Sequence, residues 1–420
     1  MRLKNSYYHL ERALKVVPEG SQTKSKMANR FPENFPKFIS HGKGSHVWDV
    51  DGNEYIDWVM GLGPIILGHA NDDVVNDVYT QANLGNVFAL PNIKEYELAE
   101  LLKRHIPCAE MSRFARNGGD ATMGAVRLAR AITGKTWVIY SGYHGGHDWI
   151  AGEIIPNAGT MNTMTCKVQF NDIEELKTRL EFLETMVSEG TAAVIMEVPP
   201  DEPKDGYLQK AIDLAHKHGA LFILDEVVTG LRYGMGGAQE KYGIVPDLAC
   251  FSKGLGNGFP ISAICGKAEY MERFNDVFFS TTFGGELTGI QAALTTVELC
   301  YQNNVADHID RIGSELREKI KWAIKELEID AELKGNSARS ILEFKDDPDM
   351  VTKTVFLQEV VKGGVLMGVP IFPCFAHTMD DVNQTIRAIE RAFLYIRRHE
   401  NDPDKGLIGK PISLIGSPRK

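Results

Sequence analysis

Two residues whose chemistry could be catalytic stand at the ends of apolar runs in this sequence. Asp225 ends the run 220–225, which is typical of a buried strand that finishes in a carboxylate. Lys253 follows the next apolar run, 248–251, after a single serine. Because ligands of open α/β sheets bind at the carboxyl ends of the strands, we expect both side chains at one ligand-binding edge.

An amine and a carboxylate at neighbouring strand ends suit pyridoxal phosphate. This cofactor needs a lysine amine for a Schiff base and an acidic partner for its pyridine nitrogen. The glycines of 254–258 would leave space for a bulky group beside Lys253. A solvated lysine and a structural aspartate are the alternative interpretations when each residue is taken singly.

Two glycine-rich segments could complete such a site. Asn117, Gly118 and Gly119 precede the helical pattern 121–132, so free backbone N–H groups and the positive end of the helix dipole could bind a phosphate. Tyr143 lies between glycines after the strand pattern 137–140, where its ring could stack on a planar heterocycle. The nearby His144 and His147 could instead bind a metal, but no third ligand is near them in the sequence, so we predict no metal site.

The elements that must position these residues follow an α/β pattern. Between about residues 113 and 290, short continuous apolar runs alternate with helical periodicity, which indicates a mostly parallel sheet covered on both faces. The expected strands are 137–140, 192–196, 221–224, 248–251 and 261–265, and the expected helices are 121–132, 172–186 and 209–217. We assign residues 69–300 to a large cofactor-binding domain.

The two ends of the chain show sequence patterns that differ from the α/β pattern of the middle. Residues 1–68 are expected to form an N-terminal arm and a hairpin, which turns at Asp51 and Gly52. Residues 301–400 predict a smaller α+β domain, with long amphipathic helices at 304–327 and 382–396 and short strands between them. Residues 401–420 are rich in Pro, Gly, Ser and Lys, and we expect a loose tail or an arm.

Composition limits the partners. The chain has 420 residues, of which 43% are hydrophobic and 24% charged, as in a globular protein. Its net charge of −10, without a basic stripe, argues against nucleic acid or an anionic membrane as the partner. The six cysteines are far apart in the sequence, and we interpret them as reduced thiols. We expect a cytoplasmic protein, since neither a secretory signal nor a membrane-spanning stretch is visible.

Eight motifs in order resemble one enzyme family. They are similar to motifs of the class III, fold-type I pyridoxal-phosphate enzymes, and most similar to the glutamate-1-semialdehyde 2,1-aminomutase branch. They are VWDVDGNEYIDW (47–58), GPIILGHA (63–70), the segment 111–135, YHG (143–145), LDEVVTGLR (224–232), FSKGLGNG (251–258), STTFGGE (280–286) and AHTMDDV (376–382). The resemblance implies a mostly parallel sheet in a large cofactor domain and a smaller α+β C-terminal domain.

The resemblance also implies roles for the residues named above. Lys253 would form the Schiff base and then move the proton between the substrate's α-carbon and the cofactor's C4′ carbon. Asp225 would pair with the protonated pyridine nitrogen. Tyr143 would stack on the ring, with His144 beside it as support. The phosphate would be bound by backbone groups of Asn117, Gly118 and Gly119, which precede the helical pattern 121–132.

Four further residues enter through the resemblance alone. Glu197 would be the family's acidic residue after its strand, and Glu202 would lie near the ring hydroxyl, unless it is a solvated loop carboxylate. Val228 takes the place where many relatives have a polar group at that hydroxyl. Thr282 would reach the phosphate of the neighbouring subunit, which implies a homodimer.

Departures from the aminomutase pattern concern the substrate. Gln22, Thr23 and Lys24 stand where its arm carries an arginine for the substrate carboxylate, and the apolar residues 369–372 replace an acidic one. We therefore predict an aminotransferase that moves an amino group from a small-molecule donor to a keto or aldehyde group of an amino-sugar precursor or a small phosphorylated compound. The alternative is glutamate-1-semialdehyde 2,1-aminomutase. A non-catalytic scaffold is a third hypothesis, against which Lys253 and Asp225 argue.

Overall fold

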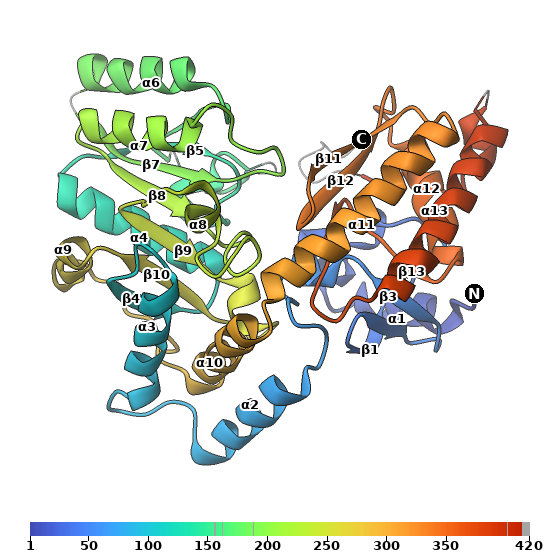
Figure 1. Cartoon of the computed structure of the whole chain (residues 1–420), viewed down its shortest axis with the longest axis horizontal. Helices are drawn as coiled ribbons and strands as arrows, with labels where there is room; N and C mark the ends of the chain where they lie inside the picture. Colours follow the sequence, from blue (N-terminus) through green and yellow to red (C-terminus); the bar gives the residue numbers. More distant parts are fainter. Residues whose placement is uncertain (155–156, 162, 188, 401, 414–420) are drawn as a thin grey trace. The chain divides into compact units, whose positions relative to one another are not determined.

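A computed structural model describes residues 1–154, 157–161, 163–187, 189–400 and 402–413 (Figure 1). The chain divides into two compact units. Unit 1 comprises Met1–Leu62, Leu67–Asn71 and the described part of His308–Lys420, and unit 2 comprises Gly63–Ile66 and Asp72–Asp307. Both ends of the chain therefore contribute to unit 1.

Unit 2 is built on a seven-stranded sheet with the order β4-β10-β9-β8-β7-β5-β6. Strands β9, β8, β7, β5 and β6 are parallel, and β10 is antiparallel to both β9 and β4. The prediction of a mostly parallel sheet is confirmed. The strands are β4 (Met111–Ala115), β5 (Trp137–Ser141), β6 (Thr165–Lys167), β7 (Thr191–Glu197), β8 (Leu221–Asp225), β9 (Leu248–Phe251) and β10 (Ser262–Gly266).

Helices cover both faces of this sheet because its strands are apolar on both sides. In β8, Ile223 packs in one hydrophobic cluster with α4, whereas Phe222 and Leu224 pack in a second cluster with α6 and α7. This explains why the central strands read as continuous apolar runs. The helices of unit 2 are α2 (Asp72–Leu84), α3 (Ile93–His105), α4 (Gly118–Thr133), α5 (Asp148–Ala151), α6 (Ile173–Met186), α7 (Tyr207–Lys217), α8 (Ala238–Tyr242), α9 (Ala268–Met271) and α10 (Leu287–Gln302).

Unit 1 contains two small sheets, with the orders β1-β2-β3-β13 and β11-β12-β14. Strands β2 and β3 pair antiparallel, and Gly52 between them has a φ of +83°, so the predicted hairpin is confirmed. Strand β3 also pairs with β13 from the far end of the chain. The strands are β1 (Ile39–Lys43), β2 (His46–Asp49), β3 (Glu54–Asp57), β11 (Ala331–Asn336), β12 (Arg339–Phe344), β13 (Val365–Leu366) and β14 (Pro370–Ile371).

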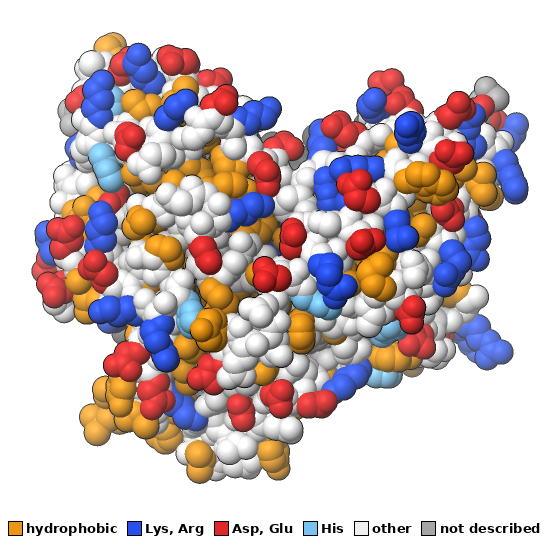
Figure 2. Space-filling model, viewed as in Figure 1, with side chains coloured by type: hydrophobic (Ala, Val, Ile, Leu, Met, Phe, Trp, Pro, Cys, Tyr) orange, Lys and Arg blue, Asp and Glu red, His pale blue; other side chains and the backbone are white. Residues whose placement is uncertain are grey.

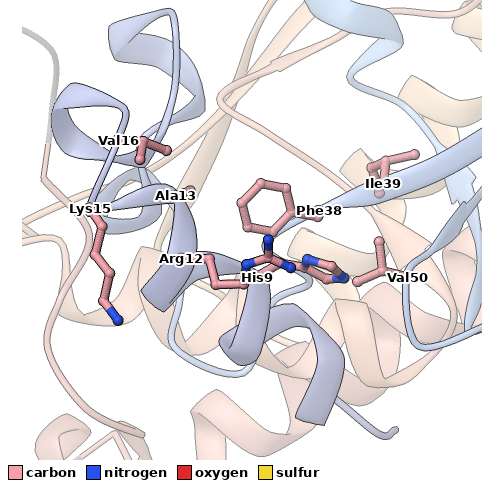
Figure 3. A pocket seen from close by; sticks show the side chains of 8 residues that line it. All are labelled: His9, Arg12, Ala13, Lys15, Val16, Phe38, Ile39 and Val50. Atoms are coloured by element: carbon pink, nitrogen blue, oxygen red, sulfur yellow. The ribbon is translucent and has the colours of Figure 1, made fainter.

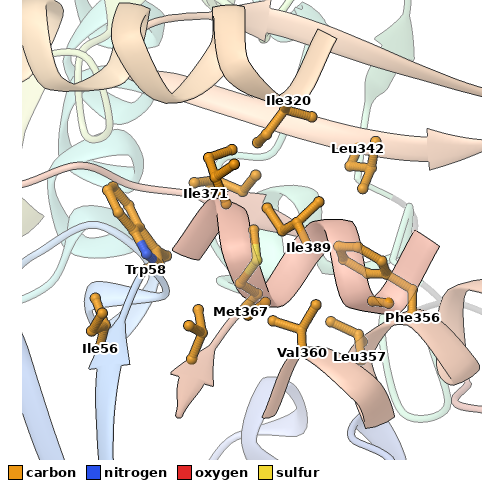
Figure 4. Packing of buried hydrophobic residues seen from close by; sticks show 14 of the residues in the cluster. Ile56, Trp58, Ile320, Leu342, Phe356, Leu357, Val360, Met367, Ile371 and Ile389 are labelled. Carbon is orange, nitrogen blue, oxygen red and sulfur yellow. The ribbon is translucent and has the colours of Figure 1, made fainter. Parts of the chain in front are cut away.

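An apolar core holds unit 1 together (Figure 4). Trp58, Phe356 and Phe393 are fully buried in it, and the last two rings lie 5.6 Å apart. The helices that surround this core carry the predicted amphipathic stripes. The helices of unit 1 are α1 (Lys4–Ala13), α12 (Val351–Lys362) and α13 (Met379–Arg398), together with most of α11 (Val305–Glu326).

The described part of the C-terminal segment packs against unit 1. Ile412 is buried, and its N–H donates to Thr354 Oγ1 at 2.9 Å. Gln358 Nε2 donates to the carbonyl of Ile408 at 2.7 Å. Residues 402–413 therefore lie against unit 1 as an arm would and do not form a loose tail, because Ile412 joins the apolar core. Residues 414–420 lie outside the described residues.

The state of the cysteines and the character of the helices can be compared with what the composition predicted. All six cysteines are free, as expected, and burial raises the pKa of the Cys265 and Cys300 thiols to about 12. Within the described ranges, no helix combines the length and the apolar character that crossing a membrane requires.

Candidate active site

Parallel strands of unit 2 end side by side at one edge of the sheet (Figure 1). The register pairs Ser141 with Met196, Glu197 with Asp225, and Asp225 with Cys250. Strand β4 runs parallel to β9, because β10 is antiparallel to both, so its carboxyl end lies at the same edge. The loops that follow these strands therefore meet there.

Asp225 is buried at this edge, with 2% of its surface exposed. Its Oδ2 lies 2.7 Å from Nδ1 of His144, and its Oδ1 accepts a hydrogen bond from the N–H of Val227 at 3.0 Å. Each carboxylate oxygen can accept a second hydrogen bond. The carboxylate is thus fixed from two sides and keeps acceptor capacity for a ligand.

His144 is equally buried and links Asp225 to the neighbouring strand. Its Nε2 lies 3.1 Å from the carbonyl oxygen of Ser141. Because a carbonyl only accepts, this contact suits an Nε2 that donates its N–H. The sequence predicted His144 beside Tyr143, but the contact with Asp225 joins segments far apart in the chain and had no local signal.

Glu226 is a second buried acid, and the sequence analysis gave it no role. Its carboxylate is fully buried and accepts hydrogen bonds from Thr229 Oγ1, from Ala238 N at 2.8 Å and from Gln239 N at 3.0 Å. Burial raises the pKa of Glu226 to about 7, because desolvation outweighs these hydrogen bonds. The available signal in the sequence was the pair of acidic residues, Asp225 and Glu226, at the end of an apolar run.

The start of α4 offers unpaired backbone donors. The N–H groups of Gly118 and Gly119 are the first two of the helix and have no hydrogen-bond acceptor among the described residues. Asn117 is the N-cap, and its N–H donates to Asp120 Oδ2 at 2.7 Å. Asp120 is in turn fixed by His147, whose Nε2 lies 2.9 Å from Oδ1. These contacts hold the helix start in place.

A side chain at either of these two glycines would crowd a neighbouring side chain. A Cβ added at Gly118 would lie 2.9 Å from the methyl groups of Val227, and one added at Gly119 would lie 2.9 Å from Cδ2 of His147. The two glycines form a cradle whose N–H groups suit a phosphate.

Tyr143 is held by its backbone while its ring is free. Its N–H donates to Oε2 of Glu197 at 3.1 Å, and its side chain is 64% exposed. Gly142 before it has a φ of +109°, and a Cβ there would lie 2.7 Å from Cβ of Glu197. Glu197 thus anchors the loop, and the aromatic ring remains available to a ligand.

Lys253 lies in the turn after β9, on the short 3-10 helix η5 (Lys253–Gly256). Its φ of +42° is in the left-handed region, which costs about 1–2 kcal/mol for a residue with a side chain. The preceding Ser252 supports the turn, since its Oγ donates to the carbonyl of Ile261 at 2.8 Å. Lys253 is half-buried. It follows β9, which pairs with β8, the strand that ends in Asp225.

Three further residues expected at the site have other surroundings. Glu202 is exposed, and its Oε1 lies 2.8 Å from Nζ of Lys241. Val228 is buried, two residues after the acidic pair of Asp225 and Glu226. Thr282 is exposed in a turn, between Phe278 and Phe283, which are 83% and 55% exposed. The contacts described for Glu202 and Thr282 join neither of them to Asp225.

The expected substrate residues belong to unit 1. Gln22, Thr23 and Lys24 are exposed, and Lys24 begins the 3-10 turn η2 (Lys24–Lys26). The side chain of Thr23 lies 3.3 Å from Oγ of Ser25. They are accessible to a small molecule, and their part in the reaction stays a prediction.

A separate hollow lies in unit 1 between α1 and strand β1 (Figure 3). Its volume is about 630 Å³, and its wall combines the cationic side chains of Arg12 and Lys15 with the ring of Phe38. None of the residues predicted for the cofactor or the substrate lines it.

The groups at the sheet edge of unit 2 fit pyridoxal phosphate. The cradle at Gly118 and Gly119 supplies donors for the phosphate, and buried Asp225 supplies an acceptor for a ring nitrogen. Lys253 supplies the amine. A planar cofactor that carries an aldehyde, a ring nitrogen and a phosphate needs this combination of donors, acceptor and amine.

The comparisons with known proteins agree with this donor set. Residues 27–393 match the family model described as aminotransferase class-III. The chain is 33% identical to the 3-aminobutyryl-CoA aminotransferase of Cloacimonas acidaminovorans, over 95% of this chain and 99% of that protein. It is 34% identical to the glutamate-1-semialdehyde 2,1-aminomutase of Methanosphaera stadtmanae, over 93% and 99%.

A solved structure extends the similarity to three dimensions. The FumI protein of Sphingopyxis sp. MTA144, solved in its PLP internal aldimine form, superimposes with a TM-score of 0.88. Its sequence is 26% identical, and the match covers 94% of this chain and 97% of that one. The fold-type I architecture expected from the sequence is confirmed.

Proposed function

This chain belongs to the class-III aminotransferase family and is a pyridoxal-phosphate-dependent enzyme, and we propose that it transfers an amino group to a keto or aldehyde group of a polar small molecule. The observation that carries the proposal is the carboxyl edge of the unit 2 sheet. There Asp225 ends one strand, Lys253 follows the next, and unpaired N–H groups begin α4.

Pyridoxal phosphate supplies an electron sink that allows a proton to leave the carbon bearing the amino group. In this proposal, Asp225 binds the ring nitrogen and keeps it protonated, with His144 fixing the carboxylate. Lys253 would hold the aldehyde carbon of the cofactor, and its amine, once released, would move a proton between the substrate's α-carbon and the cofactor's C4′ carbon, which flank the transferred nitrogen. Both the amine and the carboxylate belong to unit 2.

The remaining roles concern cofactor binding. Asn117, Gly118 and Gly119 bind the phosphate through their backbone, and Tyr143 covers one face of the ring. Glu197 holds the loop of Tyr143, which its hydrogen bond to that N–H supports. Glu202 and Val228 remain proposals for the ring-hydroxyl side, and the ion pair between Glu202 and Lys241 would have to open for this role.

The substrate proposal rests on the residues that replace the aminomutase clamp. Gln22 and Thr23 suit hydroxyl groups, and Lys24 suits a phosphate as a point charge. Lys24 lacks the bidentate fork of the arginine that the aminomutase uses for a carboxylate, so a substrate that carries only carboxylates fits these residues less well. We therefore favour an amino-sugar precursor or a small phosphorylated compound as the amino acceptor.

Aminomutase activity is the second candidate. The similarity to the enzyme of Methanosphaera stadtmanae favours it, at an identity equal to that of the aminotransferase relative within one per cent. Identity therefore does not choose between transfer to a second molecule and transfer within one. The same amine at Lys253 serves both reactions.

We also propose a homodimer in which Thr282 binds the phosphate in the neighbouring subunit. Exposed apolar side chains support a covered surface on unit 2, and Figure 2 shows hydrophobic atoms gathered at the end of the molecule where α2 and α3 lie. They are Val75, Tyr79, Leu84, Val87, Phe88, Leu90, Ile93 and Tyr96. The turn of Thr282 carries two more exposed aromatic rings, Phe278 and Phe283.

A location in the cytoplasm completes the proposal. Its support is that all six cysteines are free. Unpaired cysteines of this kind are the rule where thiols are kept reduced.

The test of the proposed activity has two steps. Borohydride treatment of the purified enzyme should fix the cofactor on Lys253, and peptide mapping reads the position of the adduct. The enzyme, loaded with the amino form of the cofactor, is then mixed with candidate acceptors, and the return of the aldehyde form is followed by absorbance. An adduct on another lysine would contradict the assignment.

The acceptor screen also separates the two candidate activities. We expect keto-sugars or phosphorylated ketones and aldehydes to react faster than glutamate 1-semialdehyde. Faster turnover of glutamate 1-semialdehyde, without consumption of a second amino donor, would replace the aminotransferase proposal by the aminomutase.

The shared site has its own test. Mixed dimers of a Lys253→Ala chain and a Thr282→Ala chain should regain activity, because one of the two sites then receives both intact residues. No recovery after verified subunit exchange would contradict the contribution of Thr282 to the neighbouring site.

A further inference from the structure

The turn 225–230 of unit 2 connects Asp225 to the start of α4 through one residue. The N–H of Val227 donates to Oδ1 of Asp225 at 3.0 Å. The methyl groups of Val227 lie against Gly118, where an added Cβ would be only 2.9 Å from each. A shift of Val227 would therefore change both the direction of the carboxylate and the support of the helix start.

The turn itself is held by the carboxylate of Glu226. Its Oε2 accepts from Thr229 Oγ1 and from Ala238 N, and its Oε1 accepts from the backbone N–H of Gln239. The side-chain amide of Gln239 adds a fourth, longer contact at 3.4 Å. A fully buried carboxylate has no water to bind, so these donors determine where it lies.

The loop that supplies these donors is shaped around the carboxylate. Gly237 has a φ of +73° and a ψ of −144°, a conformation that essentially only glycine adopts. A Cβ at Gly237 would lie 2.4 Å from Oε2 of Glu226. Gln239 continues the network, since its Oε1 accepts from the N–H of Cys108 at 3.0 Å. The turn is thereby tied to two other segments of unit 2.

We propose that Glu226 is a positioning residue that sets the place of Val227 between Asp225 and Gly118, and thereby the affinity and the orientation of bound pyridoxal phosphate. Glu226 acts through its neighbours and does not touch the cofactor. The inference rests on the proposed function, which assigns the ring nitrogen to Asp225 and the phosphate to the start of α4.

The main variant is Glu226→Gln. Glutamine keeps the shape but turns an NH₂ group toward donors that need an acceptor, so at least one hydrogen bond is lost. We expect the dissociation constant of pyridoxal phosphate, measured by equilibrium dialysis, to rise about tenfold, which corresponds to one such contact. We also expect a weaker visible circular dichroism signal per bound cofactor, because that signal depends on a fixed orientation.

A second variant and a control keep the test sharp. Thr229→Val removes one donor at nearly constant shape and should weaken cofactor binding in the same direction by a smaller factor. Glu240→Gln is the matched control, since Glu240 belongs to the same loop and its Oε2 accepts from Gly236 N at 2.6 Å. Glu240 is exposed, and we expect its variant to bind the cofactor as the wild type does.

The outcomes separate positioning from stability. A lower melting temperature of Glu226→Gln with unchanged affinity and circular dichroism would overturn the inference, and so would an equal loss of affinity in Glu240→Gln. If Glu226→Gln does not fold, wild-type binding by Thr229→Val would overturn it. A wild-type enzyme that binds no pyridoxal phosphate would instead overturn the proposed function.

Discussion

The sheet edge of unit 2 and the core of unit 1 bury polar groups in different ways. At the sheet edge, Asp225 contacts His144, and Glu226 accepts from several donors. In unit 1, burial lowers the pKa of Lys353 to about 8 and that of His377 to about 4. Burial disfavours charge in both regions, since it also raises the pKa of Glu226 to about 7, but at the sheet edge several hydrogen bonds offset part of this effect.

The surroundings of the unit 1 groups explain this contrast. Lys353 Nζ donates to the carbonyl of Leu342 at 2.8 Å and lies 5.6 Å from the centre of the Phe356 ring. His377 stacks on Trp58 with ring centres 3.9 Å apart. Apolar packing determines the geometry here, whereas hydrogen bonds between distant segments determine it at the sheet edge. We therefore expect function to depend on the polar contacts of unit 2 and stability on the packing of unit 1.

The largest expected effect is in unit 2. Lys253→Ala should reduce turnover at least about 10²–10⁴-fold, the range for the loss of a positioned proton carrier, because no other amine is proposed for that step. The unfolding midpoint should change little, since Lys253 occupies a strained left-handed conformation. Turnover and urea unfolding are measured on the same preparation. Retained turnover would contradict the assignment.

Unit 1 should show the opposite pattern. Phe356 is fully buried, with Phe344 and Phe393 at 5.5 and 5.6 Å, so Phe356→Ala should lower the free energy of unfolding by about 3–5 kcal/mol. The affinity for pyridoxal phosphate under folding conditions should stay unchanged. Leu394→Ala, at a position 44% exposed on α13, is the control and should cost about 0.5 kcal/mol or less.

The variant Asp225→Asn tests whether the negative charge of this buried carboxylate is needed for turnover. It should reduce turnover about 10²–10³-fold, because one preorganised electrostatic partner is removed. The amide still fits the contact with His144, so the fold and cofactor binding should persist. Near-wild-type turnover would show that the partner of the ring nitrogen lies elsewhere.

The smallest expected effect depends on pH. Burial holds the pKa of His377 at about 4, below its ordinary value of 6.5, so the folded state binds fewer protons between these values. This residue's contribution is complete above pH 6.5 and is lost as pH falls toward 4, by at most about 3 kcal/mol. Urea unfolding at pH 7 and pH 4.5 measures it.

The control for this effect is His377→Asn. Its side-chain oxygen can accept from Cys374 N, as Nδ1 of His377 does at 3.0 Å, but it does not titrate. The variant should lose less stability on acidification than the wild type. Equal losses in both proteins would contradict the prediction.

Local sequence patterns were sufficient for the central strands of unit 2 and for three of the helices that cover them, and they indicated several candidate site residues. The runs 221–224 and 248–251 correspond to β8 and β9, because a strand buried on both faces is apolar at every position. The glycines before α4 and the acid at the end of β8 were visible for the same reason: each depends on its own neighbours in the chain.

The sequence by itself therefore indicated the central strands of unit 2 and, as candidates for the site, the amine of Lys253, the acid of Asp225 and the glycines at the start of α4. Only the tertiary structure decided that His144 contacts Asp225, that Glu226 binds the start of α8, and that β3 pairs with β13. These contacts join segments far apart in the chain, and they depend on strand order and on which loops meet at an edge. No local periodicity encodes that order, because it follows from packing of the whole unit.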